Sequence, residues 1–145
     1  MSHTDSYHLQ RFIDAQSRDY EAALGELRRG RKRTHWIWYI FPQVAGLGHS
    51  SMAQKYAIQS KREAIAYLEH GILGGRLHEC AAALLAHQGT EIGEIMGSPD
   101  DLKLRSSMSL FASISAPGSV FHQVMDHFYG GGMDLKTLEF LENVR

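Results

Sequence analysis

The sequence predicts an all-α protein that folds as one compact domain of about seven or eight short helices. Every well-formed apolar pattern recurs at three- and four-residue steps, and none alternates over the length of a strand. The length of 145 residues corresponds to a single domain, 1–145, and we find no segment that repeats at a fixed period. The composition, 43% hydrophobic and 21% charged, is that of a globular chain and excludes a disordered protein.

Charge and cysteine content narrow the classes of function. A net charge of −1 argues against attraction of nucleic acid over the whole surface, so a nucleic-acid partner is not expected. The single cysteine, Cys80, cannot form an internal disulfide, which favours a reducing compartment. The start of the chain has no basic segment followed by an apolar run, and no apolar run approaches ~20 residues. We therefore expect a soluble, cytoplasmic protein that does not enter a membrane.

A long amphipathic helix is expected to begin the domain. Apolar residues recur at helical spacing from Leu9 to Leu27, and Gly30 suits the left-handed position that ends a helix. The aromatic run at positions 35–43 follows, and no neighbouring run offers it a partner strand. We interpret it as a short helix that stops near Phe41, because Pro42 restricts the residue before it.

Serines are expected to cap the two helices that follow. Ser50 or Ser51 would cap a helix that extends through about Gln59. Ser60 and Glu63 form an S-x-x-E capping box at the start of the next helix. In each case a hydroxyl oxygen accepts a hydrogen bond from a backbone N–H group of the first helical turn.

Glycines and prolines divide the remaining chain. The glycines at 74–75 are expected to break it before a new helix. Ser98 as N-cap and Pro99 at the first helical position give the clearest start signal in the sequence. Pro117 is expected to open another helix, and Asp134 to cap the last one. The helices predicted in this part of the chain cover 76–87, 91–96, 98–115, 117–128 and 134–141.

The segment RRGRKRTHWIWYIFPQ, positions 28–43, sets the strongest positive charge beside the richest aromatic run. One interpretation is a solvated helix end followed by core aromatic residues. The other is an anion site, because arginine and lysine contact phosphate or carboxylate while tryptophan supplies an apolar stacking wall. His35 and Gln43 bracket the aromatic run and are the polar residues expected to face a cavity.

A second polar cluster lies in SPDDLKLRSSMSLF, positions 98–111. On a helix, Asp100, Lys103 and Ser107 lie along one edge of the apolar face, and Asp101 with Arg105 along the other. Intrahelical ion pairs would account for these charges, at about 0.2–0.5 kcal/mol per pair. Such pairs do not account for three serines within four positions, which are equally suited to line a polar pocket.

Three other kinds of site are not expected. The loop at 46–51 resembles a phosphate cradle but lacks the P-loop and dinucleotide patterns, so we interpret it as an ordinary loop before a serine cap. No metal site and no cofactor are predicted, because the nine histidines form no HExxH motif and no CxxC is present. Cys80 lies in an apolar stripe, where a thiol is usually buried and inert.

Two stretches, KRTHWIWYIFPQVAGLGHSSMAQKYAI and GSPDDLKLRSSMSLFAS, resemble the bacterial and fungal proteins of domain-of-unknown-function family 1810. The similarity runs almost end to end, from LQRFIDAQ to HFYGGGMDLKTLEFL. It implies a small, soluble protein with an irregular or horseshoe-like array of helices, and it assigns no activity to any residue. Some members are labelled calpastatin. That inhibitor is an extended, disordered chain, whereas this sequence has the periodicity of a packed core, so we set the label aside.

These observations favour a protein that binds a small anionic ligand, which bears phosphate or carboxylate and has nucleotides among its candidates. The site would be a cleft between the aromatic segment 35–43 and the helix at 98–114. His35 is a candidate acid or base, although the sequence leaves open whether the protein is an enzyme. The residues predicted to bind the ligand are Arg31, Lys32, Arg33, His35, Trp36, Trp38, Gln43, Lys103, Arg105 and Ser107.

The alternative function is a protein-interaction module of the helical-array type with no catalytic activity. Helical arrays offer concave grooves, and methionines on several helices would furnish adaptable contacts. A homo-oligomer is also compatible with the sequence. The anion site differs from this alternative in one spatial requirement: two clusters far apart in the sequence must meet in the fold.

Overall fold

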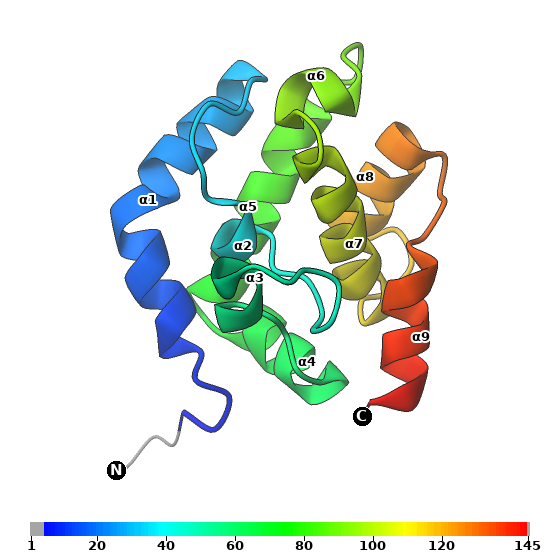
Figure 1. Cartoon of the computed structure of the whole chain (residues 1–145). Helices are drawn as coiled ribbons and strands as arrows, with labels where there is room; N and C mark the ends of the chain where they lie inside the picture. Colours follow the sequence, from blue (N-terminus) through cyan, green and yellow to red (C-terminus); the bar gives the residue numbers. More distant parts are fainter. Residues whose placement is uncertain (1–4, 145) are drawn as a thin grey trace.

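The computed structural model describes residues 5–144 and confirms an all-α fold in one compact domain (Figure 1). Nine helices occur in this range, where about seven or eight were predicted, and three of them have only four or five residues. The helices are α1 Gln10–Arg29, α2 Ile37–Ile40, α3 Ser51–Lys55, α4 Lys61–Glu69, α5 Leu73–Leu85, α6 Ile92–Met96, α7 Asp100–Ser113, α8 Val120–Tyr129 and α9 Leu135–Asn143. None of them is both long and apolar enough to cross a bilayer.

Helix α7 is the centre of the core. It packs against α2, α4, α6, α8 and α9, while α5 packs against α1, α4 and α8 (Figure 1). The predicted apolar face of Leu104, Met108 and Phe111 is completely buried. The Phe111 ring lies between the rings of Tyr67 and Phe121, with centroids 5.5 and 5.8 Å away. Burial of such aromatic side chains contributes much of the stability of a small helical domain.

Several helix ends form as the sequence predicts. Gly30 ends α1 in the left-handed conformation, with φ of 77°. The Ser60 hydroxyl accepts a hydrogen bond from Glu63 N (3.1 Å), and Asp134 Oδ2 accepts one from Thr137 N (3.1 Å). These caps are local, so the sequence alone specifies them.

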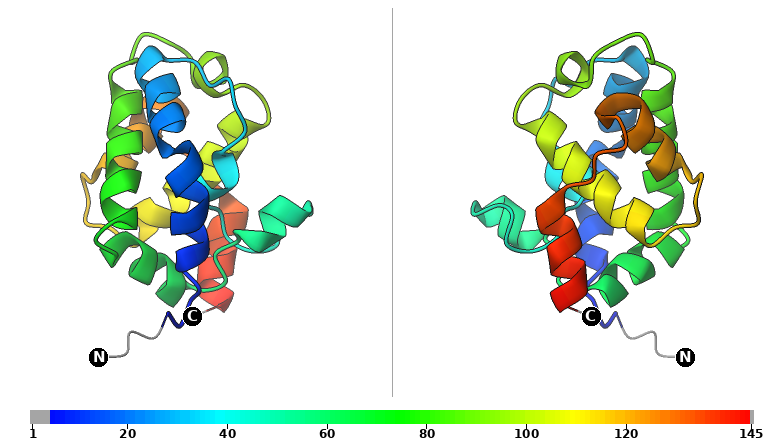
Figure 2. Two further views of the ribbon diagram at one scale, coloured as in Figure 1. Left: turned by 90° about the vertical axis from the view of Figure 1, so that its left-hand side faces the viewer. Right: turned by 90° about the vertical axis from the view of Figure 1, so that its right-hand side faces the viewer.

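Helix α3 is shorter than predicted, and this changes the site described below. It ends at Lys55 rather than near Gln59. The chain then runs beside the segment after α2, forming a parallel bridge between Val44 and Ile58. Ala45 N donates to Ile58 O (2.9 Å), and Ile58 N donates to Gln43 O (2.8 Å). These non-local bonds satisfy the backbone in place of further helical turns. Figure 2 shows α3 and the loop before it projecting from the helical body.

Helix α5 begins earlier than predicted and includes the two glycines expected to break the chain. It starts at Leu73, so Gly74 and Gly75 lie in its first turn. At Gly74 the backbone of α4 approaches closely: a Cβ atom there would lie 2.0 Å from the carbonyl oxygen of Leu68. Gly74 therefore permits tight packing between two helices rather than ending one.

The starts of α7 and α8 also differ from the prediction. Pro99, not Ser98, is the N-cap of α7, and Gly97 O accepts the hydrogen bond from Asp101 N (2.8 Å). Helix α8 begins at Val120 rather than at Pro117. Its cap is Ser119, whose hydroxyl accepts from the N–H of the third residue in the helix. In both cases a turn precedes the helix and displaces its first residue.

Candidate functional site

The aromatic segment and α7 meet in the fold, as the sequence analysis required. Between them is a hollow of about 280 Å³, to which both clusters contribute. We call it the cationic hollow, and its lining residues are Lys32, His35, Ile37, Trp38, Ser98, Pro99, Asp100 and Lys103. Four of the ten predicted ligand-binding residues are in this set.

A buried carboxylate, that of Glu26, holds the loop that carries the first half of this hollow. Glu26 accepts hydrogen bonds from the backbone N–H groups of Arg33 (2.7 Å) and Thr34 (2.9 Å). It also accepts from Thr34 Oγ1 (2.6 Å) and Trp36 Nε1 (3.0 Å). Burial raises the pKa of Glu26, but these hydrogen bonds outweigh burial and lower the pKa to about 2. Glu26 is not among the site residues predicted from the sequence.

Lys32 connects this loop to α7. Its Nζ atom lies 2.9 Å from Asp100 Oδ2 and 4.8 Å from the centre of the Trp36 ring, and it donates to Thr34 O. Its backbone N–H donates to Ile95 O (2.7 Å). Only 6% of the Lys32 side chain is exposed. Lys32 therefore has a strong structural role and contributes a fixed, partly neutralised charge to the hollow.

Lys103 is the less constrained cation. Its Nζ atom is 3.9 Å from Asp100 Oδ1 and 5.6 Å from the centre of the Trp38 ring, and 28% of its side chain is exposed. Two lysines share one aspartate, which leaves a charge of +1 on the lining residues when His35 is neutral. His35 itself is exposed at the rim. The arrangement can attract an anion to a site with an indole wall.

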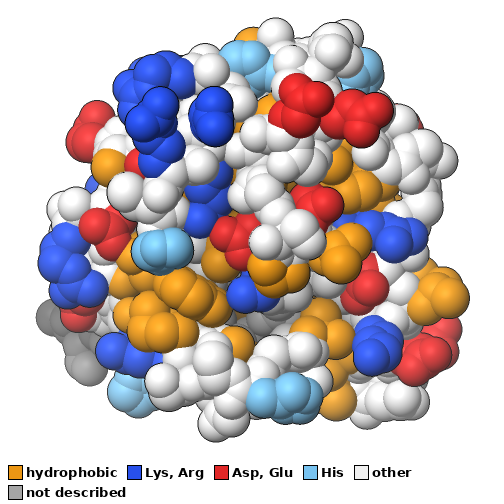
Figure 3. All heavy atoms as spheres, turned by 45° about the horizontal axis from the view of Figure 1, so that its top comes forward, with side chains coloured by type: hydrophobic (Ala, Val, Ile, Leu, Met, Phe, Trp, Pro, Cys, Tyr) orange, Lys and Arg blue, Asp and Glu red, His pale blue; other side chains and the backbone are white. Residues whose placement is uncertain are grey.

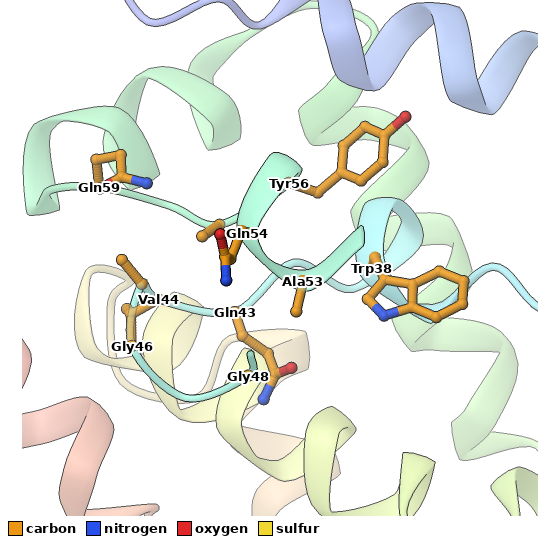
Figure 4. Close-up of a pocket in the computed structure, with 11 residues that line it drawn as sticks. Trp38, Gln43, Val44, Gly46, Gly48, Ala53, Gln54, Tyr56 and Gln59 are labelled. Atoms are coloured by element: carbon orange, nitrogen blue, oxygen red, sulfur yellow. The ribbon is translucent and has the colours of Figure 1, made fainter. Parts of the chain in front are cut away.

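A second hollow, of about 300 Å³, shares Trp38 with the first (Figure 4). We call it the amide hollow, because its lining includes three glutamine side chains and no charged residue. The Val44–Ile58 bridge holds two of its backbone segments together. Figure 4 shows the nitrogen-bearing edge of Trp38 on the side of Ala53 and Gln43. The lining residues are Trp38, Gln43, Val44, Ala45, Gly46, Gly48, Ala53, Gln54, Tyr56, Ala57 and Gln59.

Two buried polar atoms near the junction of α2 and α7 lack a hydrogen-bond partner within residues 5–144. They are the indole nitrogen of Trp38 and the hydroxyl of Ser107. Ser107 lies one helical turn after Lys103 and is completely buried. Unsatisfied buried polar groups are uncommon, since each costs about 1–3 kcal/mol. Trp38 lines both hollows, whereas Ser107 lines neither. The unpaired nitrogen of Trp38 is therefore the one that bears on ligand binding.

The other predicted site residues lie elsewhere or have other roles. Arg31 and Arg33 are exposed on the loop after α1. On the face drawn in Figure 3, Lys and Arg side chains gather at the upper left. Trp36 is buried, with its indole nitrogen on Glu26. Arg105 is directed away from the cleft, because Nε donates to Gly132 O (2.7 Å) in the turn after α8. Ser107 is in the core and lines neither hollow.

Sequence reasoning missed most of the amide hollow. Its residues at 44–59 carry no charge and match no motif, and a long α3 was expected where part of its lining is extended. Asp100 was assigned to an intrahelical pair, and that pair is present, but its closer partner is Lys32. In the described part of the chain, no three His, Cys, Asp or Glu side chains are grouped as metal ligands.

A family model described as "Protein of unknown function (DUF1810)" matches residues 6–141. The chain belongs to this family. The resemblance noted from the sequence is thus confirmed. The fold of this DUF1810 member is similar to the crystal structure of the conserved hypothetical protein Rv1873 from Mycobacterium tuberculosis. The two are 48% identical with a TM-score of 0.93, covering 95% of this chain and 99% of that one. No curated protein matches the chain.

Proposed function

We propose that this protein binds a small anionic ligand, through a phosphate or carboxylate group, in the cationic hollow between α2 and α7. One observation carries the proposal: Lys32 and Lys103 converge on a single carboxylate, Asp100, beside the Trp38 ring. The hollow is large enough for a small group, and its lining keeps an uncompensated positive charge. Lys103 would bind the anion, Trp38 would supply the apolar wall, and Lys32 would hold the loop in place.

Lys103 is available to bind an anion, although its amine also contacts Asp100. A lysine–carboxylate pair that is 3.9 Å apart and partly exposed contributes at most about 1 kcal/mol. A charge-assisted hydrogen bond to a bound anion contributes about 1.5–3 kcal/mol. The Lys103 amine therefore gains binding free energy when it moves from Asp100 to the ligand. Lys32, which is 2.9 Å from Asp100 and nearly buried, stays with Asp100.

We expect Lys103→Gln to weaken anion binding about 10- to 100-fold, the equivalent of one charge-assisted hydrogen bond. Asp100→Asn should have the opposite effect, because it removes the carboxylate that competes with the ligand. Isothermal titration calorimetry with inorganic phosphate, pyrophosphate and citrate at low ionic strength measures both changes. Lys136→Gln, an exposed lysine on α9, is the matched control for lost charge.

The proposal is wrong if the wild-type protein takes up none of the three anions at millimolar concentration. It is also wrong if Lys103→Gln and Lys136→Gln reduce affinity equally, since that would indicate a general attraction of charge. Thermal unfolding of each variant without anion establishes that the fold is retained before affinities are compared.

The fold gives little support to the alternative function, a protein-interaction module. The methionines that it requires belong to the core: Met96, Met108 and Met125 are buried, and Met52 and Met133 are partly buried and pack against the core cluster. The three exposed large hydrophobic residues of the described chain, Ile72, Leu102 and Leu135, belong to different segments. No specific observation therefore favours this function over anion binding.

A further inference from the structure

We infer that the ligand is a nucleoside monophosphate, with its phosphate in the cationic hollow and its base in the amide hollow. This inference rests on the proposed function, because it assigns the anionic part of the ligand to the site described above. It adds a second subsite of different chemistry. Trp38 is the residue common to the two subsites.

The lining of the amide hollow is suited to a neutral, planar, hydrogen-bonding group. It contains no acidic or basic side chain, so a charged group placed there would lose its hydration without compensation. Gln43, Gln54 and Gln59 each carry a carboxamide, which both donates and accepts hydrogen bonds. A base edge likewise presents donors and acceptors side by side. The rings of Trp38 and Tyr56 add apolar surface for a flat group.

The indole nitrogen of Trp38 indicates that an acceptor is missing. It is buried and has no partner within residues 5–144, although the Trp36 nitrogen, two residues earlier, has the Glu26 carboxylate. The Trp38 nitrogen lies on the edge of the ring that faces Ala53 and Gln43 (Figure 4). A base that displaces a lining side chain of the amide hollow would bring a carbonyl oxygen or ring nitrogen to this shielded atom as its acceptor.

The residue that the two hollows have in common limits the shape of a ligand that occupies both. Because Trp38 lines both, such a ligand must carry its charged group and its planar group on either side of one indole. A nucleoside monophosphate has this form, with one sugar joining a phosphate to a base. Inorganic phosphate would fill only the cationic hollow, and a free nucleoside only the amide hollow. The bipartite site therefore predicts that the joined molecule binds more tightly than either part.

The experiment compares four classes of probe by isothermal titration calorimetry: inorganic phosphate, ribose 5-phosphate, the neutral nucleosides and the four nucleoside 5′-monophosphates. At least one monophosphate should bind the wild-type protein 10-fold or more tightly than ribose 5-phosphate. Ala53→Phe, which fills the amide hollow, should remove that advantage and leave phosphate affinity unchanged. Gln43→Ala should reduce the advantage without adding bulk. Ala22→Phe, on the exposed face of α1, is the control for an added aromatic ring.

The outcomes separate this inference from the proposed function. If the monophosphates bind no better than phosphate or ribose 5-phosphate, the nucleotide inference is overturned and the anion site stands. If monophosphates bind but neither Ala53→Phe nor Gln43→Ala affects them, the base does not occupy the amide hollow and the inference is likewise overturned. If no probe binds, and pyrophosphate and citrate do not bind in the experiment under Proposed function, both proposals fail.

Discussion

Replacing Glu26 by glutamine is expected to lower the free energy of unfolding by about 3 kcal/mol at neutral pH. The loss is this large because the pKa of Glu26 is about 2 in the folded protein, against a usual value near 4.5. A glutamine of the same size offers one acceptor oxygen and sets an NH2 group against the donors of Arg33 and Thr34. Chemical denaturation of both proteins at pH 7 measures the loss.

The same substitution has a characteristic pH dependence. Because the pKa of Glu26 is lower in the folded state, its contribution is present above about pH 4.5 and is lost as the pH falls toward 2. The stability difference between wild type and Glu26→Gln should therefore shrink across that window. A difference that stays constant down to pH 2.5 would contradict this assignment. Glu21→Gln, an exposed position on the same helix, should change stability by no more than about 0.5 kcal/mol.

Substitution of Gly74 by alanine is expected to destabilise the protein by about 3 kcal/mol. The new Cβ atom would lie 2.0 Å from the carbonyl oxygen and 3.0 Å from the carbonyl carbon of Leu68, so α4 and α5 must move apart. Overpacking against backbone is costly because no side-chain rotation relieves it. The midpoint and slope of urea denaturation measure the loss.

Gly75→Ala provides the matched control, because it makes the same chemical change one residue later in the same helix. No atom lies within 4 Å of a Cβ placed there. Alanine is favoured over glycine in a helix by up to about 1 kcal/mol, so this variant should be equally or more stable than wild type. Equal losses at the two positions would mean that the α4–α5 contact does not explain the effect.

Much of the helical fold was accessible from the sequence because its signals are local. The periodicity of α1 and the caps at Ser60 and Asp134 each depend on residues within a few positions of one another. The segment after α3 was mispredicted because its hydrogen bonds run to the chain beyond α2, which no local pattern encodes. Gly74 was misinterpreted for a similar reason, since its role depends on the backbone of another helix.

The candidate site was predictable only in part. Trp38 and Lys103 line one hollow. The sequence offered the aromatic and basic residues of both segments, but whether the two segments meet was left open. The helical positions of Arg105 and Lys103 distinguish two edges of α7, but not which edge faces α2 and which faces the turn after α8. Glu26 was missed because a carboxylate among apolar residues acquires its role only from donors that the next loop brings to it.

The two tryptophans of this chain differ in environment, so the fluorescence of Trp36 can serve as a reference for that of Trp38. Trp36 is almost completely buried, and its nitrogen is held by a carboxylate, so its emission should stay constant when a molecule enters the cleft. Trp38 stands in the wall, with a lysine over its ring and a nitrogen that lacks a partner, so its emission should respond. Occupancy of the cleft can thus be followed in the unlabelled protein as a change in the emission of Trp38 relative to that of Trp36.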